Sequence, residues 1–144
     1  MIQVEVTGTE AMRAKLQRIG DVLTRQALAD TALELEQYIG DEASKHHKTG
    51  ALWRSVYKAQ TPSGWFIGHD QQHAPHARFV IEGTRPHLIT PKNKKALRWP
   101  SGGKFIFAKE VKHPGYKGDN YLQRAAAMAP AVFERHVNQK LSTL

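Results

Sequence analysis

The chain has no cysteine among its 144 residues. This absence excludes a disulfide framework, a zinc–thiolate site and a cysteine nucleophile. Long apolar runs are missing too, since none approaches the roughly 18 residues that span a bilayer. The first ten residues, MIQVEVTGTE, contain neither a basic segment nor an apolar one, so we expect no signal peptide and no membrane association. The sequence therefore favours a protein made and used in a reducing cytoplasm.

Acidic residues are scarce after residue 42. Residues 1–42 hold eight acids and four Lys and Arg, a net charge of −4, within a chain whose total is +8. Residues 43–144 hold five acids and seventeen Lys and Arg, a net charge of +12. Such asymmetry indicates an anionic partner. Nucleic acid is one candidate, and the acidic N-terminal third of another copy of the chain is a second.

The length predicts one domain over residues 1–144, and the residue patterns predict its elements. Alternation and turn signals predict strands at residues 2–6, 52–60, 65–67, 97–99 and 105–107. Apolar repeats predict helices at residues 10–19, 21–44, 77–82 and 120–141, the first two either separate or joined at a kink. The expected fold is α+β, with N-terminal and C-terminal helices packed on a mainly antiparallel sheet.

Three local features refine this layout. Gly83 should end the helix over residues 77–82, and residues 85–96 should form a projecting basic loop. Pro130 should kink the last helix or begin a new segment. The apolar stripe predicted for that helix consists of Leu122, Ala126, Ala129, Phe133, Val137 and Leu141.

Four short motifs follow one another in the chain. They are Thr49-Gly50 with Leu52 and Ser55, Glu82-Gly83-Thr84, Pro91-Lys92 with Ala96-Leu97, and Val111 with His113-Pro114-Gly115. In this order they resemble small structural proteins of long-tailed bacteriophages, the neck or head–tail joining components also described as minor tail or virion-morphogenesis proteins. The resemblance covers roughly residues 10–140. An aromatic residue that the family has between Glu82 and Gly83 is missing, and Asn120-Tyr121-Leu122 replaces Pro-Phe-Leu.

The resemblance implies a structural role in the virion of a phage or prophage. It implies a ring-forming neck component, head–tail connector or minor tail component that is needed for head–tail joining. Its partners would be copies of itself and the neighbouring head-connector and tail proteins, with non-specific DNA contact as a further option. The protein would be located in the neck or tail after assembly in the host cytoplasm. The alternative is a basic nucleic-acid-binding module.

Eight histidines suggest a metal site, but their setting does not. His69, His73 and His76 have a spacing seen in some zinc sites, with His46-His47 upstream and Asp70 as a fourth ligand. Pro75 would interrupt a helix that aligned them. We therefore interpret them as solvated loop histidines and expect no metal and no other cofactor.

Catalytic groups are equally scattered. A nuclease would pair His76 or His113 with Glu82 or Asp119, yet no such pair stands at motif spacing. The sequence contains no Gly-x-Ser-x-Gly elbow and no P-loop. We expect no enzyme activity.

A basic stretch from Arg85 to Lys112 is the remaining anomaly, with Glu110 as its single acid. It is open to three interpretations: a subunit-contact arm, a solvated face, or a nucleic-acid contact in which Trp99 and Phe105 interleave with the cations. The candidate subunit-contact residues are Arg85, Lys92, Lys94 and Lys95.

Overall fold

The computed structural model describes residues 9–46 and 49–143 of the chain. The α+β class is confirmed, because helices stand at both ends of the described chain and antiparallel strand pairs lie between them. The elements form two compact units: unit 1 holds the residues up to Ala74 and from Tyr121 onward, and unit 2 holds Pro75–Asn120. The single domain predicted over residues 1–144 stays a prediction. The strand predicted at residues 2–6 lies outside the described residues.

In unit 1, helix α1 (Thr9–Ser44) is continuous through Gly20, so the two predicted helices are one. Its C-terminal half contributes much of the core, in which Ala27, Ala32, Leu35, Ile39 and Ala43 are buried. Residues 10–26 bury no side chain. The sequence predicted that this N-terminal part would pack against a sheet, which is wrong. The other elements of unit 1 cover only the C-terminal part of the helix.

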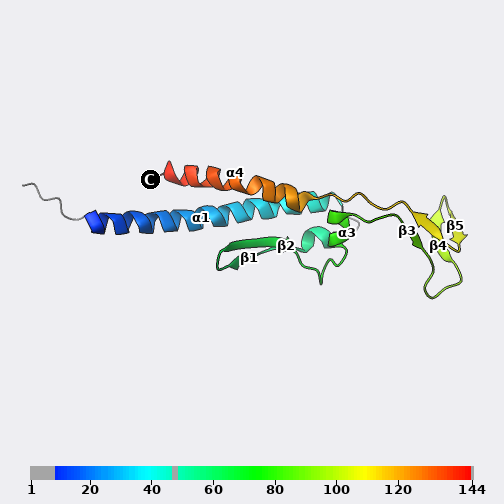
Figure 1. Ribbon diagram of the computed structural model, residues 1–144. Helices are drawn as coiled ribbons and strands as arrows, with labels where there is room; N and C mark the ends of the chain where they lie inside the picture. Colours follow the sequence, from blue (N-terminus) through cyan, green and yellow to red (C-terminus); the bar gives the residue numbers. More distant parts are fainter. Residues whose placement is uncertain (1–8, 47–48, 144) are drawn as a thin grey trace, which may run out of the picture. The chain divides into compact units, whose positions relative to one another are not determined.

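Helix α4 (Tyr121–Leu141) lies antiparallel to the C-terminal part of α1 (Figure 1). Near the start of α4, a guanidinium nitrogen of Arg124 lies 2.7 Å from a carboxylate oxygen of Glu42. Near its end, Lys140 Nζ lies 2.6 Å from Asp30 Oδ2. The helix continues through Pro130 without starting a new segment. None of the described helices is long and apolar enough to cross a bilayer.

The buried stripe of α4 differs from the predicted one. Tyr121, Ala125 and Val132 are buried, whereas the predicted Ala126 and Leu141 are exposed. The helix is thus rotated by about one residue from the expected orientation. The physical reason is Tyr121, whose fully buried side chain fixes the rotation through its contacts with unit 1.

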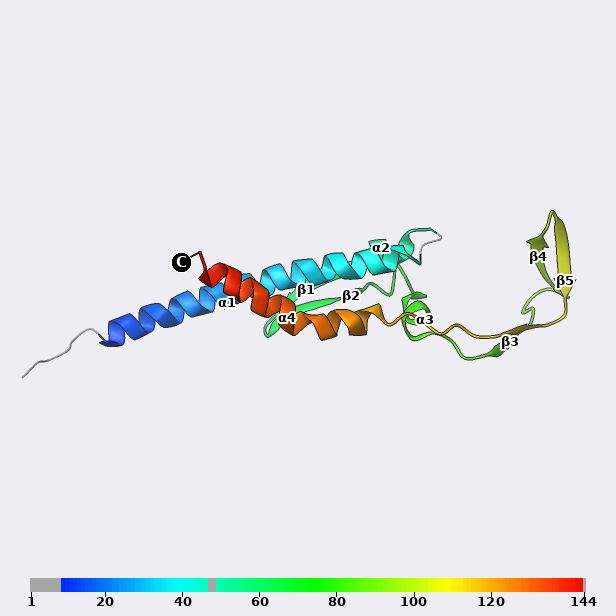
Figure 2. The same cartoon turned by 90° about the horizontal axis from the view of Figure 1, so that it is seen from above.

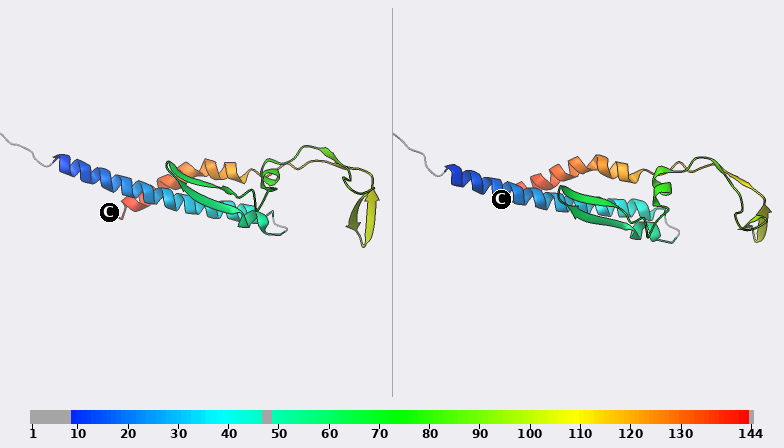
Figure 3. Two further views of the ribbon diagram at one scale, coloured as in Figure 1. Left: turned by 90° about the horizontal axis from the view of Figure 1, so that it is seen from below. Right: turned by 60° about the horizontal axis from the view of Figure 1, so that its bottom comes forward.

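The hairpin of unit 1 consists of β1 (Val56–Thr61) and β2 (Gly64–His69), which pair antiparallel. It lies along α1 (Figure 3), and Lys58 of β1 forms an ion pair with Glu36 of α1. The return strand at residues 65–67 is confirmed. The strand predicted from residue 52 is wrong at its start, because residues 51–54 form the short helix α2 (Ala51–Arg54).

Unit 2 begins with α3 (Ala77–Glu82), which ends at Gly83 as predicted. Strands β3 (His87–Ile89) and β6 (Val111–His113) pair antiparallel, so three residues of the predicted 85–96 loop form a strand. The sequence did not predict this strand because β3 pairs with residues about 24 positions further along the chain. Local residue patterns give no signal for such a distant pairing. Residues 90–96 lie outside any helix or strand.

The remaining strands of unit 2 are β4 (Leu97–Ser101) and β5 (Lys104–Ala108), which form the predicted hairpin (Figure 2). Gly102 and Gly103 have φ values of 56° and 78°. Two residues with positive φ make a type I′ turn, which matches the twist of the strands. The strands of the described chain therefore form three separate two-stranded ladders rather than one sheet.

Candidate functional site

The second and fourth sequence motifs meet in unit 2. The amide of Thr84 donates to the carbonyl of Tyr116 at 2.7 Å, and the amide of Tyr116 donates to the carbonyl of Thr84 at 3.0 Å. Gly83 and Gly115 have φ values of 83° and 87°, which favour glycine. The motif residues Glu82-Gly83-Thr84 and His113-Pro114-Gly115 thus form one structure, a backbone crossing. Thr49-Gly50 belongs to unit 1 instead.

The crossing is too tight for a side chain. A Cβ at Gly83 would lie 2.2 Å from the carbonyl oxygen of Tyr116, and one at Gly115 would lie 2.5 Å from that of Thr84. Gly118 also belongs to the crossing, although it lies outside the sequence motifs. A Cβ at Gly118 would lie 2.5 Å from the amide nitrogen of Gly83. All three contacts are with backbone, which cannot move aside as a side chain can.

His113 has a structural role at the crossing. Its Nδ1 accepts a hydrogen bond of 3.1 Å from the amide of Gly115. Its ring stacks on that of His87, with centroids 5.0 Å apart, and His87 Nδ1 donates to the carbonyl of Arg85 at 2.8 Å. The lone pair of His113 Nδ1 therefore stabilises a turn by accepting this hydrogen bond. That role disfavours His113 as the general base that a nuclease would require.

One face of the β4–β5 hairpin is apolar except for the polar pair next to the turn. Leu97 pairs with Ala108 and Trp99 pairs with Ile106, and side chains at paired positions share a face. We call this the apolar face. Ile106 is 42% exposed there.

The opposite face combines aromatic rings with a cation. It carries Arg98 and Pro100 from β4, paired with Phe107 and Phe105 from β5. The guanidinium of Arg98 lies 3.6 Å from the centroid of the Phe105 ring. Phe107 is 65% exposed. We call this the aromatic face.

Unit 2 carries nearly all of the net charge of the protein. Its ten Lys and Arg stand against three Asp and Glu, a net of +7 out of the total of +8. The four candidate contact residues Arg85, Lys92, Lys94 and Lys95 are all exposed. None of the ten cations forms an ion pair within residues 9–46 and 49–143.

The acids of α1 are in a different situation. Glu36 is paired with Lys58, Glu42 with Lys45 and Arg124, and Glu34 with Arg135 and His136. The hydrogen bond from Lys45 is the main reason that the pKa of Glu42 lies below its usual value. Desolvation raises the pKa of Glu34, but its bonds to Arg135 and His136 outweigh this and lower it. These three carboxylates are neutralised within their own unit.

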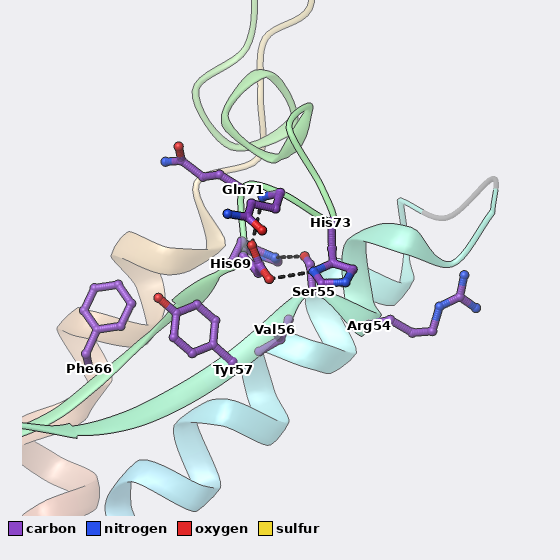
Figure 4. Close-up of a pocket in the computed structure, with 10 residues that line it drawn as sticks. Arg54, Ser55, Val56, Tyr57, Phe66, His69, Gln71 and His73 are labelled. Atoms are coloured by element: carbon purple, nitrogen blue, oxygen red, sulfur yellow. Dashed lines mark hydrogen bonds and ion pairs between the residues drawn. The ribbon is translucent and has the colours of Figure 1, made fainter.

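One histidine of unit 1, His69, joins Ser55 and Tyr121 in a partly buried series of hydrogen bonds, of which Figure 4 shows the bond to Ser55. Ser55 Oγ lies 2.8 Å from His69 Nδ1, and the hydroxyl of Tyr121 lies 2.8 Å from His69 Nε2. The Ser55 hydroxyl donates its proton to the carbonyl of Leu52 at 2.6 Å, so its oxygen accepts from His69 Nδ1–H. His69 Nε2 then accepts from Tyr121. This arrangement positions elements and does not activate Ser55 as a nucleophile.

Ser55 and His69 also line a hollow of about 660 Å³ (Figure 4). It opens between β1, β2 and the turn that follows β2. On its rim His73 Nδ1 lies 2.6 Å from Asp70 Oδ2, and this bond is the main cause that lowers the pKa of Asp70. Within the described part of the chain, no three His, Asp or Glu side chains converge as a metal ion would require.

Replacing Tyr121 with Phe should lower the free energy of unfolding by about 1 kcal/mol, because the bond to His69 is lost in a buried place. Replacing Tyr57 with Phe is the matched control. Its side chain is 41% exposed, and the change should stay within about 0.5 kcal/mol. Urea unfolding followed by circular dichroism measures both. Equal effects would show that the Tyr121 hydroxyl contributes nothing specific.

Comparison with protein-family models, with curated proteins and with solved structures found no match to this chain.

Proposed function

We propose that this protein is a structural virion protein of a long-tailed phage or prophage. It acts as a ring-forming neck component, head–tail connector or minor tail component and is needed for head–tail joining. Its partners are copies of itself and the neighbouring head-connector and tail proteins. The order of the four sequence motifs supports the family, and the surface of unit 2 supports a role in assembly.

The observation that carries this proposal is the shortage of a core in unit 2. Ala77 is the only buried residue among residues 75–120, all of which the structure describes. Large apolar side chains on its strands remain exposed instead: Leu88, Ile89, Phe105, Ile106 and Phe107. Large exposed apolar side chains gathered in one unit are typical of a protein interface.

The energetics favour the same role. A two-stranded hairpin is marginally stable in water, and burial of a large apolar side chain contributes about 1.5–3 kcal/mol. In unit 2 most of that contribution is still available to a neighbour. A segment that completes its burial on docking is suited to ordered assembly, because the contacts of each added subunit stabilise it further.

A catalytic role receives no comparable support. His113 and His69 both use ring nitrogens to hold backbone or side-chain groups in place. We therefore propose that the protein is not an enzyme and works without a cofactor. The competing function, a basic nucleic-acid-binding module, explains the charge of unit 2 but not the exposure of Leu88, Ile89 and Ile106.

Deletion of the gene from the phage or prophage genome that carries it tests the proposal. We expect DNA-filled heads and separate tails in electron micrographs, with infectivity restored by a plasmid copy. Rings of the purified protein, measured by native mass spectrometry, should accompany this result. Normally joined particles in the deletion strain would contradict the proposed function.

A further inference from the structure

The basic residues of unit 2 could bind an anionic partner, and the acidic part of α1 on another copy is a poor candidate. Glu34, Glu36 and Glu42 already form ion pairs within their own unit. Unit 1 as a whole has eleven Lys and Arg against ten Asp and Glu, a net of +1. The net charge of unit 1 is therefore small and has the same sign as the +7 of unit 2.

The cations of unit 2 surround a defined hollow. Residues 91–94, residues 96–98 and Phe107 line a space of about 560 Å³ next to the start of β4. Lys92, Lys94 and Arg98 supply three positive charges, while Pro91, Ala96, Leu97 and Phe107 supply apolar surface. Lys95 does not line this space, but it lies between lining residues in the sequence and is exposed. Several cations thus stand beside an exposed aromatic ring.

This combination matches a nucleic-acid strand better than an acidic protein. A strand carries a regular row of phosphates that several separate cations can contact together. It also carries flat bases that stack on aromatic side chains, as Phe107 on the aromatic face would allow. A two-stranded β-ribbon additionally fits the major groove of a duplex.

We infer that the Lys92–Arg98 segment and Phe107 form a sequence-independent nucleic-acid contact. Phosphates would bind Lys92, Lys94, Lys95 and Arg98, and the ring of Phe107 would face a base or sugar. This contact uses the aromatic face of the β4–β5 hairpin, so the apolar face stays available to a protein neighbour. The inference goes beyond the proposed virion role and does not depend on it.

Fluorescence anisotropy of the purified full chain tests this inference, with labelled single-stranded and duplex DNA of about 20 nucleotides. If four phosphates are neutralised, affinity should fall about 100-fold between roughly 50 and roughly 200 mM salt. Changing Lys92, Lys94 and Lys95 together to Glu should weaken binding at least about 10-fold and flatten the salt dependence. Phe107→Ala should weaken single-strand binding more than duplex binding if a base stacks there.

The matched control is Arg13→Glu, Lys15→Glu and Arg18→Glu on α1, which changes the net charge of the protein by the same amount. These side chains are exposed and lie in unit 1. The control should retain binding within about 3-fold of the original chain, because it leaves the Lys92–Arg98 segment and Phe107 unchanged. A triple change of Lys92, Lys94 and Lys95 to Gln repeats the test with a smaller perturbation. Circular dichroism confirms that each variant is folded.

Two results would overturn the inference. One is no binding to either DNA form at about 150 mM salt. The other is equal weakening by the α1 control, since the segment would then have no special role. Neither result bears on head–tail joining, which the deletion experiment measures in particles. A protein that joins heads and tails without binding DNA would refute this contact alone.

Discussion

Replacing Gly83 with Ala should abolish the paired hydrogen bonds between Thr84 and Tyr116 while unit 1 stays folded. The new Cβ would lie 2.2 Å from the carbonyl oxygen of Tyr116, so the two backbone segments must separate. The φ of 83° adds a conformational cost of about 1–3 kcal/mol. Hydrogen exchange at the amides of Thr84 and Tyr116 is the right measurement, because unit 2 has too little core to dominate thermal unfolding. We expect protection there to fall about 100-fold or more.

Gly102→Ala separates the effect of conformation from that of crowding. Gly102 also has positive φ, at 56°, but nothing lies within 4 Å of its added Cβ. This control should cost about 1 kcal/mol, and it should leave exchange at Thr84 and Tyr116 nearly unchanged. Gly118→Ala should behave like Gly83→Ala, since it would crowd the same crossing from the opposite side. If all three variants exchanged alike, close backbone approach would not be the reason for these glycines.

If the proposed function is correct, changing both Leu88 and Ile106 to Asp should block head–tail joining. These side chains are 55% and 42% exposed, so charges are tolerated in the free protein. In an assembled interface each would place an unpaired carboxylate against apolar surface. At about 1.5–2 kcal/mol for each lost anchor, docking should weaken about 100-fold or more. Complementation of a deletion strain, scored as infectious titre, measures this.

Leu33→Asp with Leu141→Asp serves as the control for this variant. Both residues are about half exposed, and both lie on the helices of unit 1. Circular dichroism should show that both double variants are folded. An unchanged titre for the Leu88 and Ile106 variant would show that the strands of unit 2 do not form the interface. An equal loss of titre with the control would show that any added surface charge disrupts assembly.

Features with a strong local signal could be predicted from the sequence. Gly83 ends α3 at the expected residue because a glycine after a short apolar helix accepts positive φ. The turns before Gly64 and after Ser101 also gave the correct hairpins, since turn residues fix the reversal locally. The spacing of apolar residues predicted α1 but not which part of it would be covered.

Features that depend on distant partners could not be predicted. β3 was missed because His87 and Ile89 acquire a strand conformation only through pairing with β6. The chain from Ser55 through His69 to Tyr121 joins residues that no motif connects. The composition of the chain does not single out Phe107 as a site residue. Only its pairing with Arg98 in the β4–β5 register shows that the two side chains share a face.

Pro100 has a consequence for the two outer edges of the β4–β5 hairpin. Ser101 and Lys104 flank the type I′ turn and exchange the first hydrogen bonds, so the backbone of Pro100 points outward from β4. Proline has no amide hydrogen, and a strand added at that edge would find a donor missing. The edge of β5 keeps the outward amides of Phe105 and Phe107. The β4 edge keeps only the outward amide of Arg98, so edge-to-edge addition is favoured at β5 and its continuation into a fibre is disfavoured.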